Sequence, residues 1–204
     1  MRTRTNIGIV TLGVALAAGS MAMAESGPAP AAAFTADGRL QFPKDYRTWI
    51  YLSSGIDMAY VEGGGGAMSA FDNVFVDPAA YASFQKTGTW PDKTVFVLEV
   101  RGAQAHASID RTGRSQGAVM GVEAHVKDVA RFKSGWAFFQ MNAQEQLVAP
   151  VQPQTSTCNA CHEQHAAVDT TFVQFYPTLL PLATAKGTLS AAYLAEEKAA
   201  KPAK

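Results

Sequence analysis

The sequence lacks the features of a nucleic-acid-binding or membrane-spanning protein. Its 17 Lys and Arg residues balance 17 Asp and Glu residues, and no basic cluster predicts a nucleic-acid partner. No apolar run approaches the ~20 residues of a transmembrane helix. Hydrophobic residues make up 48% of the 204, which is enough for one globular domain with its own core.

The first 24 residues have the pattern of an export signal. Arg2 and Arg4 precede the apolar run 8–18, and a small-residue cleavage motif ends at Ala24. The run is shorter than a spanning helix, although an uncleaved anchor is the alternative. We therefore expect residues 1–24 to be a signal peptide, no membrane span in the mature chain, and a periplasmic location.

The rest of the chain is predicted to hold a single domain. Residues 25–40 are expected to form a Pro/Ala-rich linker, 41–186 the folded domain, and 187–204 an Ala/Lys/Glu-rich tail that frays. The hydrophobic periodicity predicts helices over 43–54, 79–88 and from 158 to about 180, and strands over 73–78, 93–102, 118–126 and 135–142. This order predicts an α+β fold, a mainly antiparallel sheet with flanking helices.

The chain has only two cysteines, and they lie close to a histidine. Cys158, Cys161 and His162 form the Cys-x-x-Cys-His pattern by which haem c is attached. Two thiols with this spacing reach the two vinyl groups of one haem, and the adjacent histidine becomes an axial ligand of the iron. An export signal agrees with attachment outside the cytoplasm. The motif therefore predicts one covalent haem c, with a C-terminal helix carrying it.

Three other uses of the cysteine pair remain open at this point. An oxidising compartment would permit a disulfide between Cys158 and Cys161. A zinc site would need further ligands, for which His106, His125 and His165 remain. A thioredoxin-like redox pair would be expected early in a βαβ unit, whereas this pair follows a run of strands.

Several segments together resemble the cytochrome P460 family, which includes the cytochromes c′-beta. They are 43–50, 73–99, 121–128, 135–139 and 158–177. The resemblance implies a mainly antiparallel β fold, a homodimer, and a five-coordinate haem c with His162 as the axial ligand. It also implies that the open face of the iron binds small molecules such as nitric oxide.

One position departs from part of that family. In the hydroxylamine-oxidising members, a lysine immediately before the glutamate of this strand is bonded to the haem ring, and here that position is Leu98. Strand alternation sends Phe96 and Leu98 to one face, which we expect to face the haem. Lys93 lies five residues away on the opposite face and is a poor substitute. Leu98 therefore favours an apolar cavity that binds nitric oxide or a similar small ligand.

Another position favours the enzyme. Glu123 matches the family's distal carboxylate, which would accept protons during hydroxylamine oxidation. The alternative is a strand residue that faces solvent. Asp72 stands where the hydroxylamine oxidisers carry an arginine, which weakens that assignment. Electron transfer to a redox partner protein, through a six-coordinate haem, is the third possibility.

The remaining candidates have simpler structural interpretations. A sixth iron ligand could come from methionine, but methionine in a strand usually fills a core. A second histidine near the motif is expected at the surface, and the aromatic residues of the last strand are expected in the core. These residues are Met120 and Met141, His165, and Trp136, Phe138 and Phe139.

Overall fold

The computed structural model describes residues 32–59, 68–105, 108–141, 147–148 and 157–200. The expected signal peptide (1–24) and most of the glycine-rich segment 62–69 lie outside these residues. None of the helices in the described ranges is long and apolar enough to cross a membrane.

The centre of the fold is a five-stranded antiparallel sheet, which confirms the predicted α+β class. Each strand pairs with the next one along the chain, and the connection from β3 to β4 contains helix α1. The strands are β2 (Ile50–Ile56), β3 (Ala70–Val76), β4 (Val95–Gln104), β5 (Ser115–Lys127) and β6 (Trp136–Met141). A separate antiparallel pair joins β1 (Leu40–Gln41) to β7 (Leu147–Val148).

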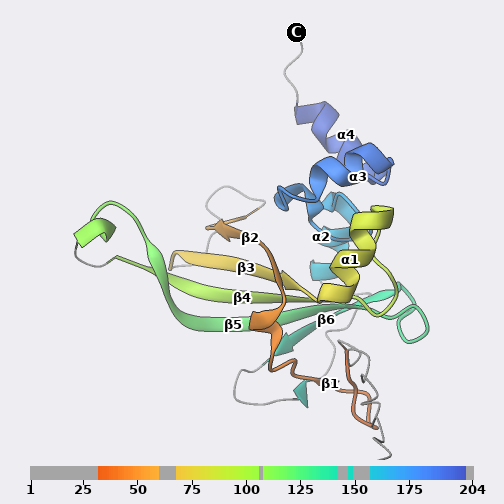
Figure 1. The fold of residues 1–204 in the computed structure, drawn as a ribbon, viewed down its shortest axis with the longest axis horizontal. Helices are drawn as coiled ribbons and strands as arrows, with labels where there is room; N and C mark the ends of the chain where they lie inside the picture. Colours follow the sequence, from red (N-terminus) through yellow and green to blue (C-terminus); the bar gives the residue numbers. More distant parts are fainter. Residues whose placement is uncertain (1–31, 60–67, 106–107, 142–146, 149–156, 201–204) are drawn as a thin grey trace, which may run out of the picture.

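The helices gather on one side of this sheet, while β1 lies on the other (Figure 1). They are α1 (Pro78–Thr87), α2 (Thr157–His165), α3 (Leu180–Lys186) and α4 (Ala191–Ala200). The described residues also form the 3₁₀ turns η1 (Tyr46–Thr48), η2 (Ser108–Asp110) and η3 (Val173–Phe175). Helix α1 confirms the prediction over 79–88. Its N-terminus is capped by the Asp77 carboxylate, which accepts a hydrogen bond from the Ala80 amide at 2.8 Å.

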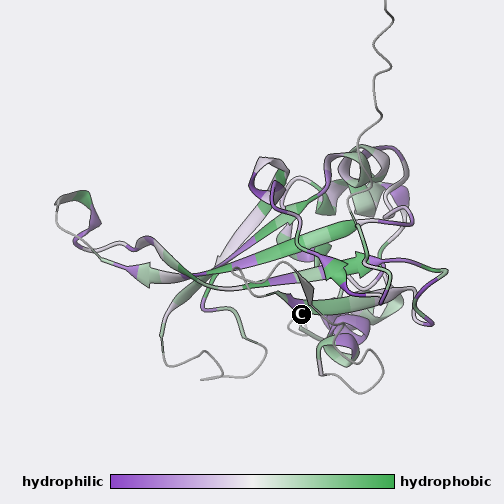
Figure 2. Cartoon of the chain, turned by 90° about the horizontal axis from the view of Figure 1, so that it is seen from below, coloured by the Kyte–Doolittle hydropathy of each residue, from purple (hydrophilic) through white to green (hydrophobic). Residues whose placement is uncertain are grey.

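Strand alternation gives the sheet two different apolar faces. Val95 and Val97 pack with β1 and η1 on one face, whereas Phe96 packs beneath the helices on the other. Figure 2 shows that the strands are hydrophobic where they cross the body of the molecule and more hydrophilic toward the projecting end of the β4–β5 hairpin. The cavity described below lies on the helix side.

Two helix predictions were wrong. Residues 43–54 form only the turn η1 before the chain becomes extended at Trp49 and enters β2. The β-branched and aromatic residues that follow pair with β3, and this pairing outweighs their helical spacing. The C-terminal segment is also not one helix. Helix α2 ends at His165, and α3 begins at Leu180, where Pro181 suits a helix start.

Both flanking segments contribute packed residues. The ring of Phe34, in the predicted linker, packs against those of Phe132 and Phe139, with centroid separations of 6.3 and 6.1 Å. At the other end, the Ser190 hydroxyl donates to the Ala166 carbonyl at 2.7 Å just before α4. Most of the segment expected to fray is therefore helical and attached to the domain.

Candidate functional site

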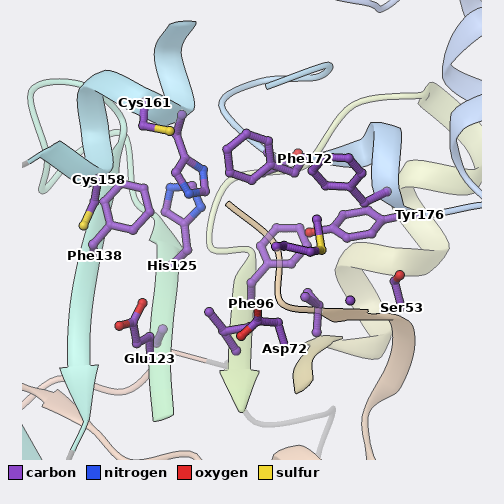
Figure 3. Close-up of a pocket in the computed structure, with 18 of the residues that line it drawn as sticks. Ser53, Asp72, Phe96, Glu123, His125, Phe138, Cys158, Cys161, Phe172 and Tyr176 are labelled. Atoms are coloured by element: carbon purple, nitrogen blue, oxygen red, sulfur yellow. The ribbon is translucent and has the colours of Figure 1, made fainter. Parts of the chain in front are cut away.

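A cavity of about 810 Å³ lies between the helix side of the sheet and α2. Its walls come from all five strands of the sheet, from α2 and from residues 171–176, and they are mainly apolar. Figure 3 shows the aromatic side chains of Phe96, Phe172 and Tyr176 around it. Its size falls within the roughly 300–1,000 Å³ of small-molecule and cofactor sites.

The wall formed by α2 carries the cysteine–histidine motif. Cys158, Cys161 and His162 all line the cavity, because residues three and four apart share one face of a helix. The two thiols are free. Burial raises the pKa of the Cys161 thiol, and the charges of Cys158 and Glu196 raise it further.

The His162 ring is held in one orientation by the turn after α2. Asp169 and Thr170 adopt positive φ angles of 47° and 58°, and the Thr170 carbonyl lies 2.8 Å from His162 Nδ1. A carbonyl can only accept, so Nδ1 carries the proton and Nε2 keeps a lone pair that could bind a metal. Burial lowers the pKa of His162, although the bond to Thr170 opposes this. The neutral imidazole that results is the form that binds a metal.

The opposite region of the cavity is formed by rows of cross-strand neighbours. Leu98 on β4 pairs with Val74 on β3 and with Glu123 on β5. In the next row, Phe96 pairs with His125. Phe96 and Leu98 both line the cavity, as strand alternation predicts.

Lys93 lies outside this row, at the turn before β4. Its ammonium group forms an ion pair with Asp128, and its side chain is half exposed. It is not among the residues that line the cavity. The Lys93 amine is therefore not placed to substitute for a lysine at position 98.

Glu123 faces the cavity and is only partly exposed, in contrast to the solvent-facing alternative. Burial raises the pKa of its carboxyl, the charge of Asp72 raises it further, and a hydrogen bond with Gln140 partly offsets both. Asp72 also lines the cavity, and its pKa is raised by burial and by Asp57. The described lining contains no lysine or arginine, so neither carboxylate has a cation beside it there.

Comparison with known protein families identifies the family of this chain. The sequence profile of the cytochrome P460 family matches residues 43–173, well over half of the protein. The chain belongs to the cytochrome P460 family. The matched segment contains the whole sheet and all of α2. A search of curated protein sequences gives no match.

Membership of the cytochrome P460 family implies haem, with its iron, as the cofactor. The residues present fit that group. One wall of an apolar cavity offers two free thiols and an imidazole whose Nε2 is available. By contrast, no group of three or more His, Cys, Asp or Glu side chains in the described part of the chain could hold a metal ion by itself. A zinc site therefore lacks its further ligands there.

His125 is a site residue that the motif did not reveal. It is 8% exposed. Its ring centroid lies 4.0 Å from that of Phe138, on which it stacks, and 5.0 Å from that of His162. Its Nε2 has no hydrogen-bond partner among the described residues. Its position in the sequence could have revealed it, because His125 follows Glu123 by two residues on one strand and so lies on the same face of the sheet.

The other candidates are divided between core and surface. Met141 is buried on the far face of the sheet, as expected. The same prediction was wrong for Met120, which is 48% exposed and does not line the cavity. His165 Nδ1 lies 3.0 Å from Glu196 Oε2 of α4. Trp136 and Phe139 are core residues, as expected. Phe138 differs from the prediction, since it lines the cavity against His162.

Proposed function

We propose that this cytochrome P460-family protein is a periplasmic mono-haem c protein that binds nitric oxide or a similar small ligand. Cys158 and Cys161 would form the two thioether bonds, and His162 would be the one protein ligand of the iron. When bound, the haem supplies an iron with one face open to a small molecule. The export signal supports the location, and the family resemblance leads us to expect a homodimer.

Leu98 is the observation that carries this proposal. It lies in the cavity wall between Val74 and Glu123, at the position of the cross-linking lysine of the hydroxylamine oxidisers. A leucine cannot form a bond to the haem ring through nitrogen. Together with Val74 and Phe96 it makes this wall apolar.

The apolar wall also bears on which ligand is favoured. Bound oxygen is partly charged and gains from hydrogen-bond donors, which Leu98 and Val74 do not offer. Nitric oxide binds strongly without such help. An apolar surround also limits access of water to the site. These side chains therefore favour a small neutral ligand.

Hydroxylamine oxidation is the second candidate, and Glu123 is the residue that favours it. Its carboxyl lies in the cavity with a raised pKa, and a carboxylate whose pKa moves toward neutrality is a better proton acceptor. Under this alternative, Glu123 would take protons from the substrate. The missing lysine at Leu98 is the reason for ranking it second.

Intact-mass measurement tests the attachment. The mature protein, produced with a working cytochrome c maturation system, should carry the added mass of one haem. Cys158→Ala together with Cys161→Ala should lose that covalent mass. A mature wild-type chain without haem would overturn the proposal.

A paired assay then separates the two functions. The ferrous protein should bind nitric oxide, while turnover of hydroxylamine with an artificial electron acceptor should be slow or absent. Rapid hydroxylamine oxidation that Glu123→Gln abolishes would establish the enzyme instead.

A further inference from the structure

A methionine lies at the mouth of the cavity. Among the exposed large hydrophobic residues of the described ranges, only Met58 and Phe175 also line the cavity, and they are 43% and 39% exposed. A side chain that both lines a cavity and meets solvent lies at its boundary. Met58 follows β2, and Figure 3 places Ser53 of that strand across the cavity from Cys158.

The backbone before Met58 is fixed by Asp57. This residue has a positive φ of 53°, and its amide donates to the Ala70 carbonyl at 3.1 Å. Its carboxylate accepts hydrogen bonds from the Ser69 hydroxyl at 2.7 Å and the Ala70 amide at 3.0 Å. These bonds tie the end of β2 to the start of β3. Met58, the next residue, lies with its side chain against Gly55 of β2.

Gly55 provides the space into which Met58 folds. A Cβ atom at Gly55 would lie 1.9 Å from Met58 Sδ and 2.7 Å from its Cγ, far closer than atoms can approach. The thioether therefore occupies the volume that a side chain at position 55 would fill. Gly55 itself lines the cavity, two residues after Ser53 on the same strand.

We propose that Met58 is an apolar gate at the mouth of the cavity, which a small ligand must displace to reach the haem, and that Gly55 sets its position. The inference rests on the proposed function, because it concerns access to the same site. Methionine suits this role, since its unbranched side chain has three rotatable bonds and is easily moved. Met58 acts through its volume, so an apolar side chain of similar size should replace it.

The test measures the association rate of carbon monoxide with the ferrous haem-loaded protein, by flash photolysis. Met58→Ala should raise the rate about tenfold, which corresponds to a barrier lower by about 1.4 kcal/mol. Met58→Leu conserves volume and should stay within roughly twofold of the wild type. Met68→Ala is the matched control and should change nothing, because Met68 is 66% exposed and does not line the cavity.

A double-mutant cycle tests the role of Gly55. Gly55→Ala forces Met58 from its place, so it should change the rate in the wild-type background and have no effect in the Met58→Ala background. Equal effects in both backgrounds would refute the coupling. A wild-type rate in Met58→Ala would refute the gate, and so would Met58→Leu behaving like Met58→Ala.

Different results would refute the proposed function and the role of Met58. If the wild-type ferrous protein binds neither carbon monoxide nor nitric oxide, the proposed function is wrong and the gate falls with it. If the wild type binds both gases at rates that no Met58 variant changes, only the gate is wrong. Haem content, measured by intact mass, confirms that each variant has been loaded.

Discussion

Glu99 and Glu123 are carboxylates on neighbouring strands of one sheet, and they have opposite environments. Glu99 is 3% exposed on the face away from the cavity. Burial alone would raise its pKa, but hydrogen bonds from Arg101, Tyr46 and Arg47 hold the pKa below its ordinary value. Glu123 faces the cavity with Gln140 as its hydrogen-bond partner and Asp72 as a repulsive neighbour, and its pKa is raised.

The two environments shift the pKa values of the two carboxylates in opposite directions. The Glu99 carboxylate stays ionised because donors surround it. Its hydrogen bonds from Tyr46 and Arg47 hold η1 against β4. Glu123 has no cation beside it in the described cavity lining and gives up its charge more easily. A carboxyl in that state can exchange protons with a bound ligand. The same residue type is therefore held in its ionised form on one face of the sheet and shifted toward its neutral form on the other.

Removing the structural charge should have the largest effect on stability. Glu99→Ala removes the acceptor of the Tyr46 hydroxyl and of Arg47, and leaves Arg101 with only the Gly117 carbonyl. It should cost roughly 2–4 kcal/mol of unfolding free energy. Urea unfolding of the haem-loaded protein measures this. Glu197→Ala, an exposed change on α4, is the control and should stay within about 0.5 kcal/mol. A Glu99→Ala protein as stable as the control would show that the cluster contributes nothing.

Removing the cavity charge should change the pH dependence of stability. The folded protein holds a proton on Glu123 above the ordinary pKa of 4.5, where the unfolded chain releases it. The stability of the wild type should therefore fall relative to Glu123→Gln as pH rises from 4.5 through the raised pKa. Urea unfolding of both proteins across that window tests the sign. A difference that is constant with pH would contradict the raised pKa.

A smaller effect should follow from removing the neighbour of Glu123. Asp72→Asn abolishes the repulsion and should lower the pKa of Glu123, but only in part, since burial is the larger cause. Carbon-13 NMR of the ferrous carbon monoxide form can follow the carboxyl of Glu123, assigned with Glu123→Gln. Asp45→Asn removes an exposed charge outside the cavity and should leave the pKa unchanged. Equal shifts in both variants would mean that Asp72 acts only through net charge.

The sequence predicted the parts of this site that depend on local patterns. The spacing of Cys158, Cys161 and His162 placed all three on one helix face. Strand alternation correctly placed Phe96 and Leu98 on the same face of β4, in the cavity wall. The strands were found because their β-branched and aromatic runs are bounded by turn residues. Segment 43–54 was missed because its helical spacing also fits a strand whose partner lies some twenty residues further along the chain.

Other parts of the site depend on contacts that no local pattern contains. Strand alternation places His125 on the same face as Glu123, but only the packing of α2 against the sheet brings its ring 5.0 Å from that of His162. Met58 lies at the cavity because Asp57 adopts a left-handed turn and Gly55 lacks a side chain, and neither feature signals a cavity by itself. The raised pKa of Glu123 depends on its burial in the folded protein and, to a lesser extent, on Asp72 two strands away.

The most direct test of the central claim is the absorption spectrum of the purified ferrous protein, recorded before and after addition of nitric oxide. With Leu98 in the cavity wall, the spectrum should be that of ordinary five-coordinate haem c, and nitric oxide should change it. A red-shifted band of the kind produced by a ring–lysine bond, or a spectrum that nitric oxide leaves unaltered, would contradict the account.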